Sequence, residues 1–185
     1  LIVNLKAGQY RVQEIKAPKG YAINPNYQTV TVEAGEVNSV NLVEAMAEPP
    51  VIDPAPLRLQ KTVDGETPAD NPNGKYKDLS GIEFRVSHYT GLYTTAAEAE
   101  ESDTKTASVV LATDANGRLD LNSRVVSGSW PYKFHGGNTS PLGTLVIEEV
   151  STLDGLIISL GKPIIQLTDK DNDGIAERNF FGAFA

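Results

Sequence analysis

The chain has 185 residues and a net charge of −8, with no run of basic residues. This acidic balance excludes nucleic acid and anionic membranes from the expected partners. Cysteine is absent, so a disulfide framework and a cysteine-ligated metal site are excluded as well. The hydrophobic content of 40% is ordinary for a globular protein, and no apolar run is long enough to span a bilayer.

Short strands with turn signals between them are predicted throughout residues 1–46. The segment Gly8–Ile15 alternates at the strand period, so Tyr10, Val12 and Glu14 share one face. The other predicted strands are Leu1–Leu5, Gln28–Glu33 and Val37–Val43. Four short strands cannot bury a core of their own. We therefore interpret residues 1–46 as the C-terminal part of a first domain, and the chain as a fragment of a longer secreted protein.

Residues 47–56 are predicted to be a linker. Four prolines in these ten residues favour an extended spacer with limited flexing, which would hold two domains in line.

Residues 57–185 are predicted to form a second, complete all-β domain of the sandwich type. Its expected strands are Leu57–Lys61, Ile82–Val86, Ala107–Thr113, Arg118–Leu121, a strand from Gly143, a strand around Leu156–Leu160, Ile164–Thr168 and Ala176–Phe181. Residues 96–103 are acidic and rich in alanine, which fits either a short helix or a mobile loop. Residues 127–140 are expected to be a loop.

Two charged residues end rows that are otherwise apolar. Ile147 and Glu149 share one strand face, and Leu59 and Lys61 share another. An unpaired charge is costly to bury, so Lys61 and Glu149 are expected to meet in the core. A buried salt bridge is one alternative, and two exposed strand ends are another. Glu148 faces the other side of its strand and is expected to be solvated.

The segment from Gly8 to Tyr21 reads Gly-Gln-Tyr-Arg-Val-Gln-Glu-Ile-Lys-Ala-Pro-Lys-Gly-Tyr. It resembles the Glu-box signature of Cna B-type (SpaA-like, prealbumin-like) domains, which build the stalks of Gram-positive surface adhesins and pilins. The segment from Gly143 to Leu156 matches the same template in part. Supporting segments, in the family's order, are Leu57–Lys61, Leu79–Phe84 and Thr113–Gly117. The resemblance implies tandem immunoglobulin-like β-sandwiches, the first incomplete, on an extracellular, cell-wall-anchored surface protein or pilus.

The resemblance also implies an isopeptide bond between side chains. Lys61 would be the nucleophile, Glu149 the assisting acid, and Asn179 on the closing strand the acceptor. A desolvated lysine is neutral and nucleophilic, and a desolvated glutamic acid can shuttle protons. Each molecule reacts once, so no turnover enzyme is expected. In the first domain the Glu-box residue is Glu14, with Asn41 as a candidate acceptor.

The first domain's lysine strand would precede Leu1. The parent protein would supply the missing strands, or a neighbouring molecule would donate one by strand addition. Asn38 competes with Asn41 as the acceptor of that domain.

The loop from Asp169 to Gly174 resembles the first half of a calcium loop. Asp169, Asp171 and Asp173 would supply carboxylates at alternate positions, and Glu177 would stand in for the usual bidentate glutamate. The alternative is an Asn-Asp-Gly hairpin turn without a metal. No other cofactor is expected.

The favoured function is a structural stalk or spacer, with neighbouring domains of the same surface protein or pilus as partners. The alternative is an adhesive module that binds a host matrix protein or a glycan through loops 87–140. Those loops carry Trp130, Tyr132, Phe134 and His135, which would either contact a ligand or cap the edge of the sandwich. His88 and His135 are expected on loops or strand surfaces, and a zinc site is not expected.

Overall fold

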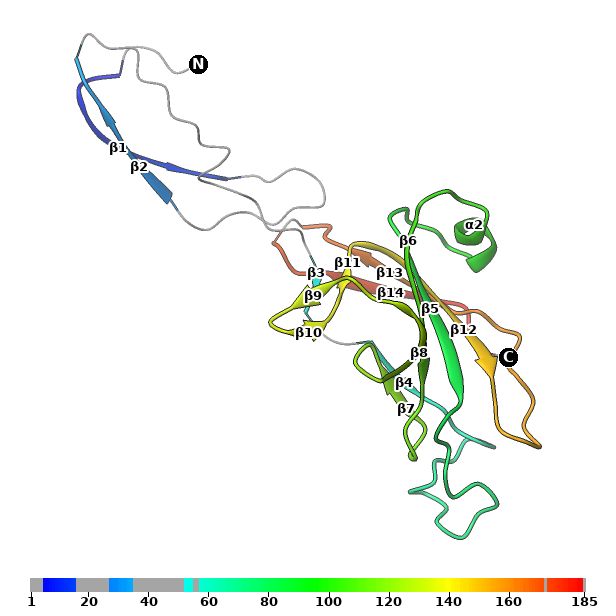
Figure 1. Cartoon of the computed structure of the whole chain (residues 1–185). Helices are drawn as coiled ribbons and strands as arrows, with labels where there is room; N and C mark the ends of the chain where they lie inside the picture. Colours follow the sequence, from blue (N-terminus) through cyan, green and yellow to red (C-terminus); the bar gives the residue numbers. More distant parts are fainter. Residues whose placement is uncertain (1–4, 16–26, 35–51, 55–56, 172, 185) are drawn as a thin grey trace. The chain divides into compact units, whose positions relative to one another are not determined.

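The computed structural model describes residues 5–15, 27–34, 52–54, 57–171 and 173–184 (Figure 1). They fall into two compact units. The smaller contains strands β1 and β2, and the larger spans residues 52–168 and 176–185.

The smaller unit is an antiparallel pair of strands. β1 (Gly8–Gln13) pairs with β2 (Tyr27–Val32). Along β1 and just after it, Tyr10, Val12 and Glu14 are half-buried between exposed neighbours, which confirms the predicted alternation. The predicted strands at 1–5 and 37–43 lie outside the described residues, apart from Leu5, and so do Asn38 and Asn41.

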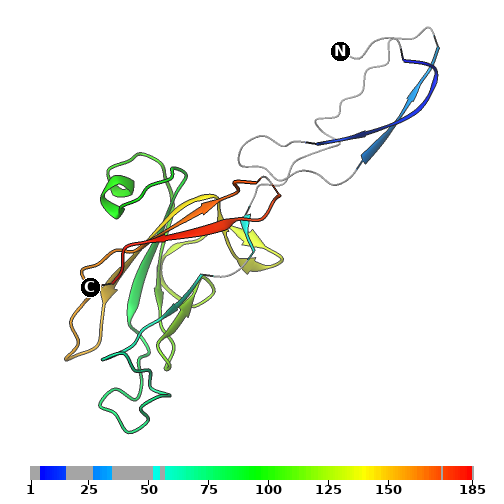
Figure 2. The same ribbon diagram turned by 180° about the vertical axis from the view of Figure 1, so that it is seen from behind.

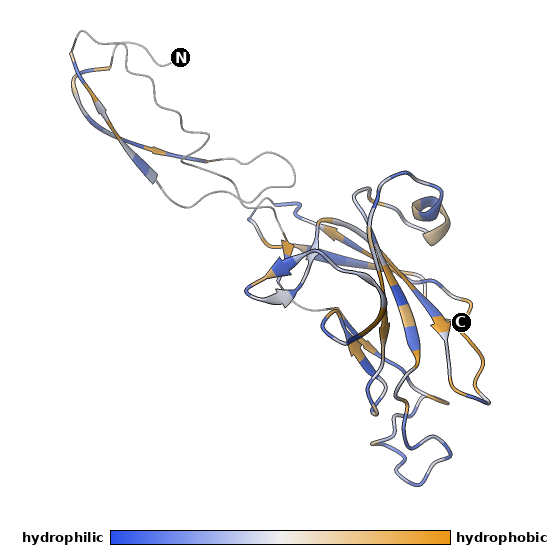
Figure 3. Cartoon of the chain, viewed as in Figure 1, coloured by the Kyte–Doolittle hydropathy of each residue, from blue (hydrophilic) through white to orange (hydrophobic). Residues whose placement is uncertain are grey.

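The larger unit is built on a six-stranded antiparallel sheet, in the order β14-β13-β12-β5-β6-β8 (Figures 1 and 2). Its strands are β5 (Glu83–Tyr89), β6 (Lys105–Ala112), β8 (Arg124–Ser129), β12 (Gly143–Ser151), β13 (Ile164–Thr168) and β14 (Glu177–Phe181). Apolar and polar residues alternate along β5, visible as bands in Figure 3, because successive side chains point to opposite faces.

Three short strand pairs complete the larger unit. They are β4 (Arg58–Gln60) with β7 (Arg118–Asp120), β3 (Ile52–Asp53) with β11 (Ser140–Pro141), and β9 (Lys133–Phe134) with β10 (Gly137–Asn138). Of the two structures predicted for residues 96–103, the short helix is confirmed, as α2 (Ala96–Glu100). Thr95 caps its N-terminus by accepting from the Glu98 backbone, and Glu98 reaches back in a capping box.

Each face of the six-stranded sheet covers a core. The main core lies between this sheet and the β4–β7 pair, and includes Phe84, Val86, Leu119, Leu145 and Ile147. A smaller cluster on the opposite face, under α2, groups Tyr89, Ala99, Val146 and Ile164. Two layers of antiparallel strands around one main core confirm the all-β prediction.

Three predictions are corrected by the larger unit. Residues 156–160 form no strand, and Ile157 and Leu160 are 90% and 88% exposed. Residues 127–140 are not a plain loop, because β9, β10, β11 and the end of β8 occupy most of them. The segment 47–56 is not a spacer throughout, because Ile52 and Asp53 pair with β11 and belong to the larger unit.

Candidate functional site

Lys61 and Glu149 meet in the larger unit, as the sequence predicts. Lys61 follows β4 and Glu149 lies near the end of β12. The Lys61 Nζ is 2.9 Å from both carboxylate oxygens of Glu149. Only 1% of the Glu149 side chain and 17% of the Lys61 side chain are exposed. The two side chains therefore form a bidentate contact that joins the β4–β7 layer to the six-stranded sheet.

Local structure fixes the position of both charged groups. The Lys61 backbone N–H donates to the Gly117 carbonyl at 2.8 Å, which extends the pairing of β4 with β7 by one residue. The Glu149 carboxylate also accepts the Ser159 backbone N–H at 3.1 Å. The carboxylate thus accepts hydrogen bonds from a lysine and a main-chain amide, which compensates for its burial.

Asn179 is not brought to this pair. It lies opposite Gln166, and Gln166 lies opposite Thr144. Directly opposed residues of antiparallel strands point to the same face, so Asn179 shares the face of Thr144. Thr144 and Glu149 are an odd number of positions apart on β12 and therefore point to opposite faces. The strand register contradicts the prediction that Asn179 is the acceptor, because that prediction rests only on its position on the closing strand.

The calcium candidates do gather. Asp169, Asp171, Asp173 and Glu177 each offer a carboxylate oxygen, and these oxygens all lie within 4.8 Å of one another. The turn is shaped by Asp169, which accepts the backbone N–H of Asp173 at 3.1 Å and that of Gly174 at 3.3 Å. Oxygen ligands at this spacing suit a hard divalent cation.

Within the aromatic cluster, Trp130 caps the sandwich and does not face solvent. This indole is 7% exposed, and its Nε1 donates to the Thr139 carbonyl at 2.6 Å. It packs edge-on against Tyr132, with ring centroids 5.7 Å apart. Phe134 is partly exposed and lies against His135.

His88 is a buried polar residue that sequence reasoning missed. It continues the inward row of Phe84 and Val86 on β5, and that row was the available signal. Its Nε2 lies 3.0 Å from the Leu142 carbonyl and must donate to it, which leaves Nδ1 to accept from the Thr106 hydroxyl at 2.6 Å. Burial lowers the pKa of His88, against a smaller raising effect of the Leu142 carbonyl.

A charge network covers the outer face of the sheet beside α2. Glu148 was expected to be solvated, but it pairs with Arg85 and, at 3.2 Å, with Lys162. Lys162 also reaches Glu100 at 2.8 Å. Burial alone would raise the pKa of Glu148, but the hydrogen bonds and charges of Lys162 and Arg85 outweigh burial and lower it.

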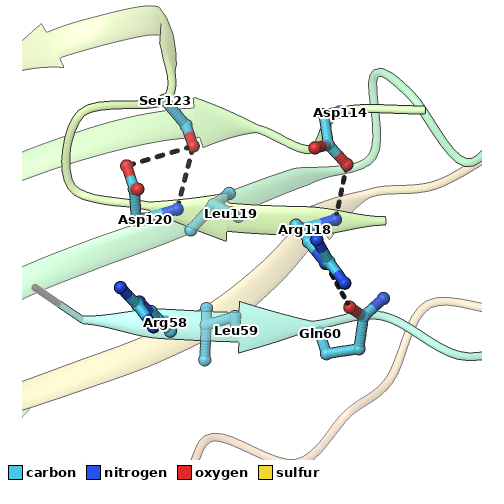
Figure 4. A pocket seen from close by; sticks show the side chains of 8 residues that line it. All are labelled: Arg58, Leu59, Gln60, Asp114, Arg118, Leu119, Asp120 and Ser123. Atoms are coloured by element: carbon cyan, nitrogen blue, oxygen red, sulfur yellow. Dashed lines mark hydrogen bonds between the residues drawn. The ribbon is translucent and has the colours of Figure 1, made fainter. Parts of the chain in front are cut away.

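A depression of about 650 Å³ lies on the outer face of β4 and β7 (Figure 4). Its polar groups mostly bind one another. The Arg118 backbone N–H donates to Asp114 at 2.9 Å, and the Arg118 Nε donates to Gln60 at 3.3 Å. The Asp120 backbone N–H donates to the Ser123 hydroxyl at 2.8 Å. These contacts favour a structural surface over a catalytic site.

Glu14, the Glu-box residue of the smaller unit, is half-buried immediately after β1. The described part of the chain contains no helix with the length and apolar character that a membrane crossing requires.

A family model described as SpaA, prealbumin-like fold domain, matches residues 1–46. Neither the curated proteins nor the solved structures contain a match. The matched segment holds the complete Gly8–Tyr21 template, on which the resemblance was based. Residues 1–46 of this chain are therefore similar to the SpaA prealbumin-like fold domain, as the Glu14 motif predicts.

Proposed function

We propose that this chain is a structural stalk or spacer segment of a Gram-positive cell-surface adhesin or pilin. The prealbumin-like domain in residues 1–46 indicates a pilin or adhesin module. The contact between Lys61 and Glu149 carries the mechanical part of the proposal, because it ties the short strand β4 to the opposite layer. Such a tie resists peeling of β4 in a protein without cysteines.

The same pair supplies two of the three groups that an isopeptide bond needs. The Lys61 amine would attack a side-chain carboxamide, form an amide and release ammonia, while Glu149 carries protons. The fold would supply the high effective concentration. The acceptor would have to lie on the inner face at the level of Glu149. Phe84 marks this level, because it is directly opposite Glu149. The Phe184 ring lies 5.6 Å from the Phe84 ring, so the segment after β14 comes close to this level.

Intact mass under denaturing conditions distinguishes the two forms of the tie. A loss of one ammonia, with a cross-linked peptide that contains Lys61, would support the covalent form and identify the acceptor. A measured mass equal to the mass calculated from the sequence would mean that the ion pair between Lys61 and Glu149 is the tie. A cross-link from Lys61 to Asn179 would contradict the register described above.

Single-molecule stretching of the full chain tests the stalk role itself. Lys61→Met should lower the unfolding force of the larger unit, whereas Arg85→Met, which removes an outer-face ion pair, should not. Equal forces for wild type and Lys61→Met would argue against a mechanical function.

The alternative, an adhesive module that uses loops 87–140, receives less support because Trp130 is buried. A binding screen against glycans and matrix proteins, with Phe134→Ala as the exposed-aromatic control, addresses it directly.

A further inference from the structure

The segment that enters the larger unit holds a buried carboxylate. Asp53 lies on β3, directly after residues with the composition of a spacer, yet it is only 6% exposed. Aspartate is almost never this buried without a partner. Among the residues that the structure describes, β3 contributes two paired residues, Ile52 with Pro141 and Asp53 with Ser140. A ladder this short holds weakly by itself.

The partner of Asp53 lies on the closing strand. Arg178 on β14 donates to the Asp53 carboxylate through both Nε and Nη2. Arg178 shares the core-facing side of the sheet with the buried Leu167, which it is directly opposite, and 34% of its side chain is exposed. The contact joins residues that are 125 positions apart, so it connects the entry of the larger unit to its last strand.

A second contact connects β3 to the core. The Thr139 hydroxyl donates to the Asp53 carbonyl. Thr139 is itself buried, and its own carbonyl accepts the Trp130 indole N–H. Backbone pairing, an ion pair and a buried hydroxyl therefore all converge on one aspartate.

We propose that Asp53 and Arg178 form an entry clamp that fixes the proline-rich segment 47–56 to the larger unit at Asp53, where β3 begins the paired structure of that unit. A proline-rich chain is stiff along its own length, but it transmits direction only if its end is also fixed. The clamp supplies that fixed end. Its role in stiffening a stalk rests on the proposed function, whereas its local closing of β3 onto β11 and β14 does not.

Hydrogen exchange of the full chain, read by mass spectrometry, tests the clamp. Hydrogen bonds to charged groups are worth about 1.5–3 kcal/mol, so Asp53→Asn and Arg178→Met should each speed exchange in residues 52–60 by about tenfold or more. Exchange in β5 and β12 should stay at the wild-type rate. The double variant should change exchange by less than the product of the two single effects, because the two single changes share the contact between Asp53 and Arg178.

Arg85→Met is the matched control, since it breaks an arginine–carboxylate pair elsewhere on the sheet. Its exchange in residues 52–60 should equal that of wild type. Unchanged exchange in both Asp53→Asn and Arg178→Met would overturn the clamp. If both variants unfold the whole larger unit, Arg178→Lys, which keeps the charge, should restore the fold with intermediate exchange, and wild-type exchange in that variant would also overturn the clamp.

A distance measurement separates the stiffening role from the local clamp. The chain has no cysteine, so Gln9→Cys and Ser127→Cys provide two unique dye sites on exposed strand positions. Asp53→Asn should broaden the distribution of energy transfer between them. Faster exchange without broadening would overturn the stiffening role, whatever the stretching experiment shows about Lys61.

Discussion

Lys61 and Glu149 lie 88 positions apart in the sequence, yet the Lys61 amine contacts both oxygens of the Glu149 carboxylate. Each residue ends an apolar row on a different layer of the sandwich, and the two rows converge on the same core. The contact is therefore a direct product of strand alternation in two separate segments.

Removing one member of this pair should destabilise the larger unit strongly. Lys61→Met leaves the Glu149 carboxylate buried without its cation, and the expected loss is about 3–5 kcal/mol in the free energy of unfolding. The double variant Lys61→Met with Glu149→Leu should recover most of that loss, because it removes the charge that needs a partner. Urea unfolding of the three proteins measures both effects. A double variant as unstable as the single one would show that the site needs the ionic pair itself.

Asn179→Ala should have little effect. The side chain is half-buried on the face opposite Glu149, so the expected change in unfolding free energy is within about 1 kcal/mol. The difference between the measured mass and the mass calculated from the sequence should be the same in this variant as in wild type. If the alanine variant abolished an ammonia loss seen in wild type, the strand register of β14 would be wrong.

His88 should make stability depend on pH. Its pKa is lowered in the folded state because burial favours the neutral ring. The unfolded chain then binds more protons, so stability is complete above the ordinary histidine pKa of about 6.5 and falls as pH drops toward the folded pKa. The groups around the ring are the Thr106 hydroxyl, the Leu142 carbonyl, Tyr132 and Trp130.

Urea midpoints from pH 5 to pH 8 test this prediction. His88→Gln should flatten the profile in this window. A nitrogen-detected NMR spectrum should show the proton on Nε2 of His88. A proton on Nδ1 of the neutral ring would contradict the assigned hydrogen bonds.

Calcium is expected to bind at the carboxylates of Asp169, Asp171, Asp173 and Glu177 and to raise the melting temperature. The physical reason is that a divalent cation relieves the mutual repulsion of four clustered carboxylates. Asp171→Asn should remove the shift, and Asp154→Asn, at an exposed position in another loop, should preserve it. Equal melting temperatures with calcium and with a chelator would rule out a stabilising site.

Trp130→Ala should cost stability rather than ligand binding. Truncating a buried indole typically costs about 3–5 kcal/mol. Trp130 is the only tryptophan, so fluorescence reports on this site alone. The folded protein should emit at shorter wavelength than the unfolded one, and emission at the wavelength of exposed indole would contradict its burial.

Periodicity alone located most strands, because each alternating segment needs only to present one apolar face. Gly143–Ser151 and Ile164–Thr168 form where the pattern places them. The same reasoning failed at residues 156–160, where apolar side chains occur in a loop. Sequence cannot reveal that β13 already occupies the adjacent edge of β12.

The sequence by itself determined that the chain is all-β and that residues 1–46 carry a prealbumin-like signature. It also predicted a meeting of Lys61 and Glu149, with two exposed strand ends as the open alternative. Only the tertiary structure decided the direction of Asn179, the burial of His88 and the capture of Asp53 by Arg178. Each of these depends on the register between distant strands. A side chain's face within one strand follows from local alternation, but its partner across the sheet depends on how whole strands are aligned.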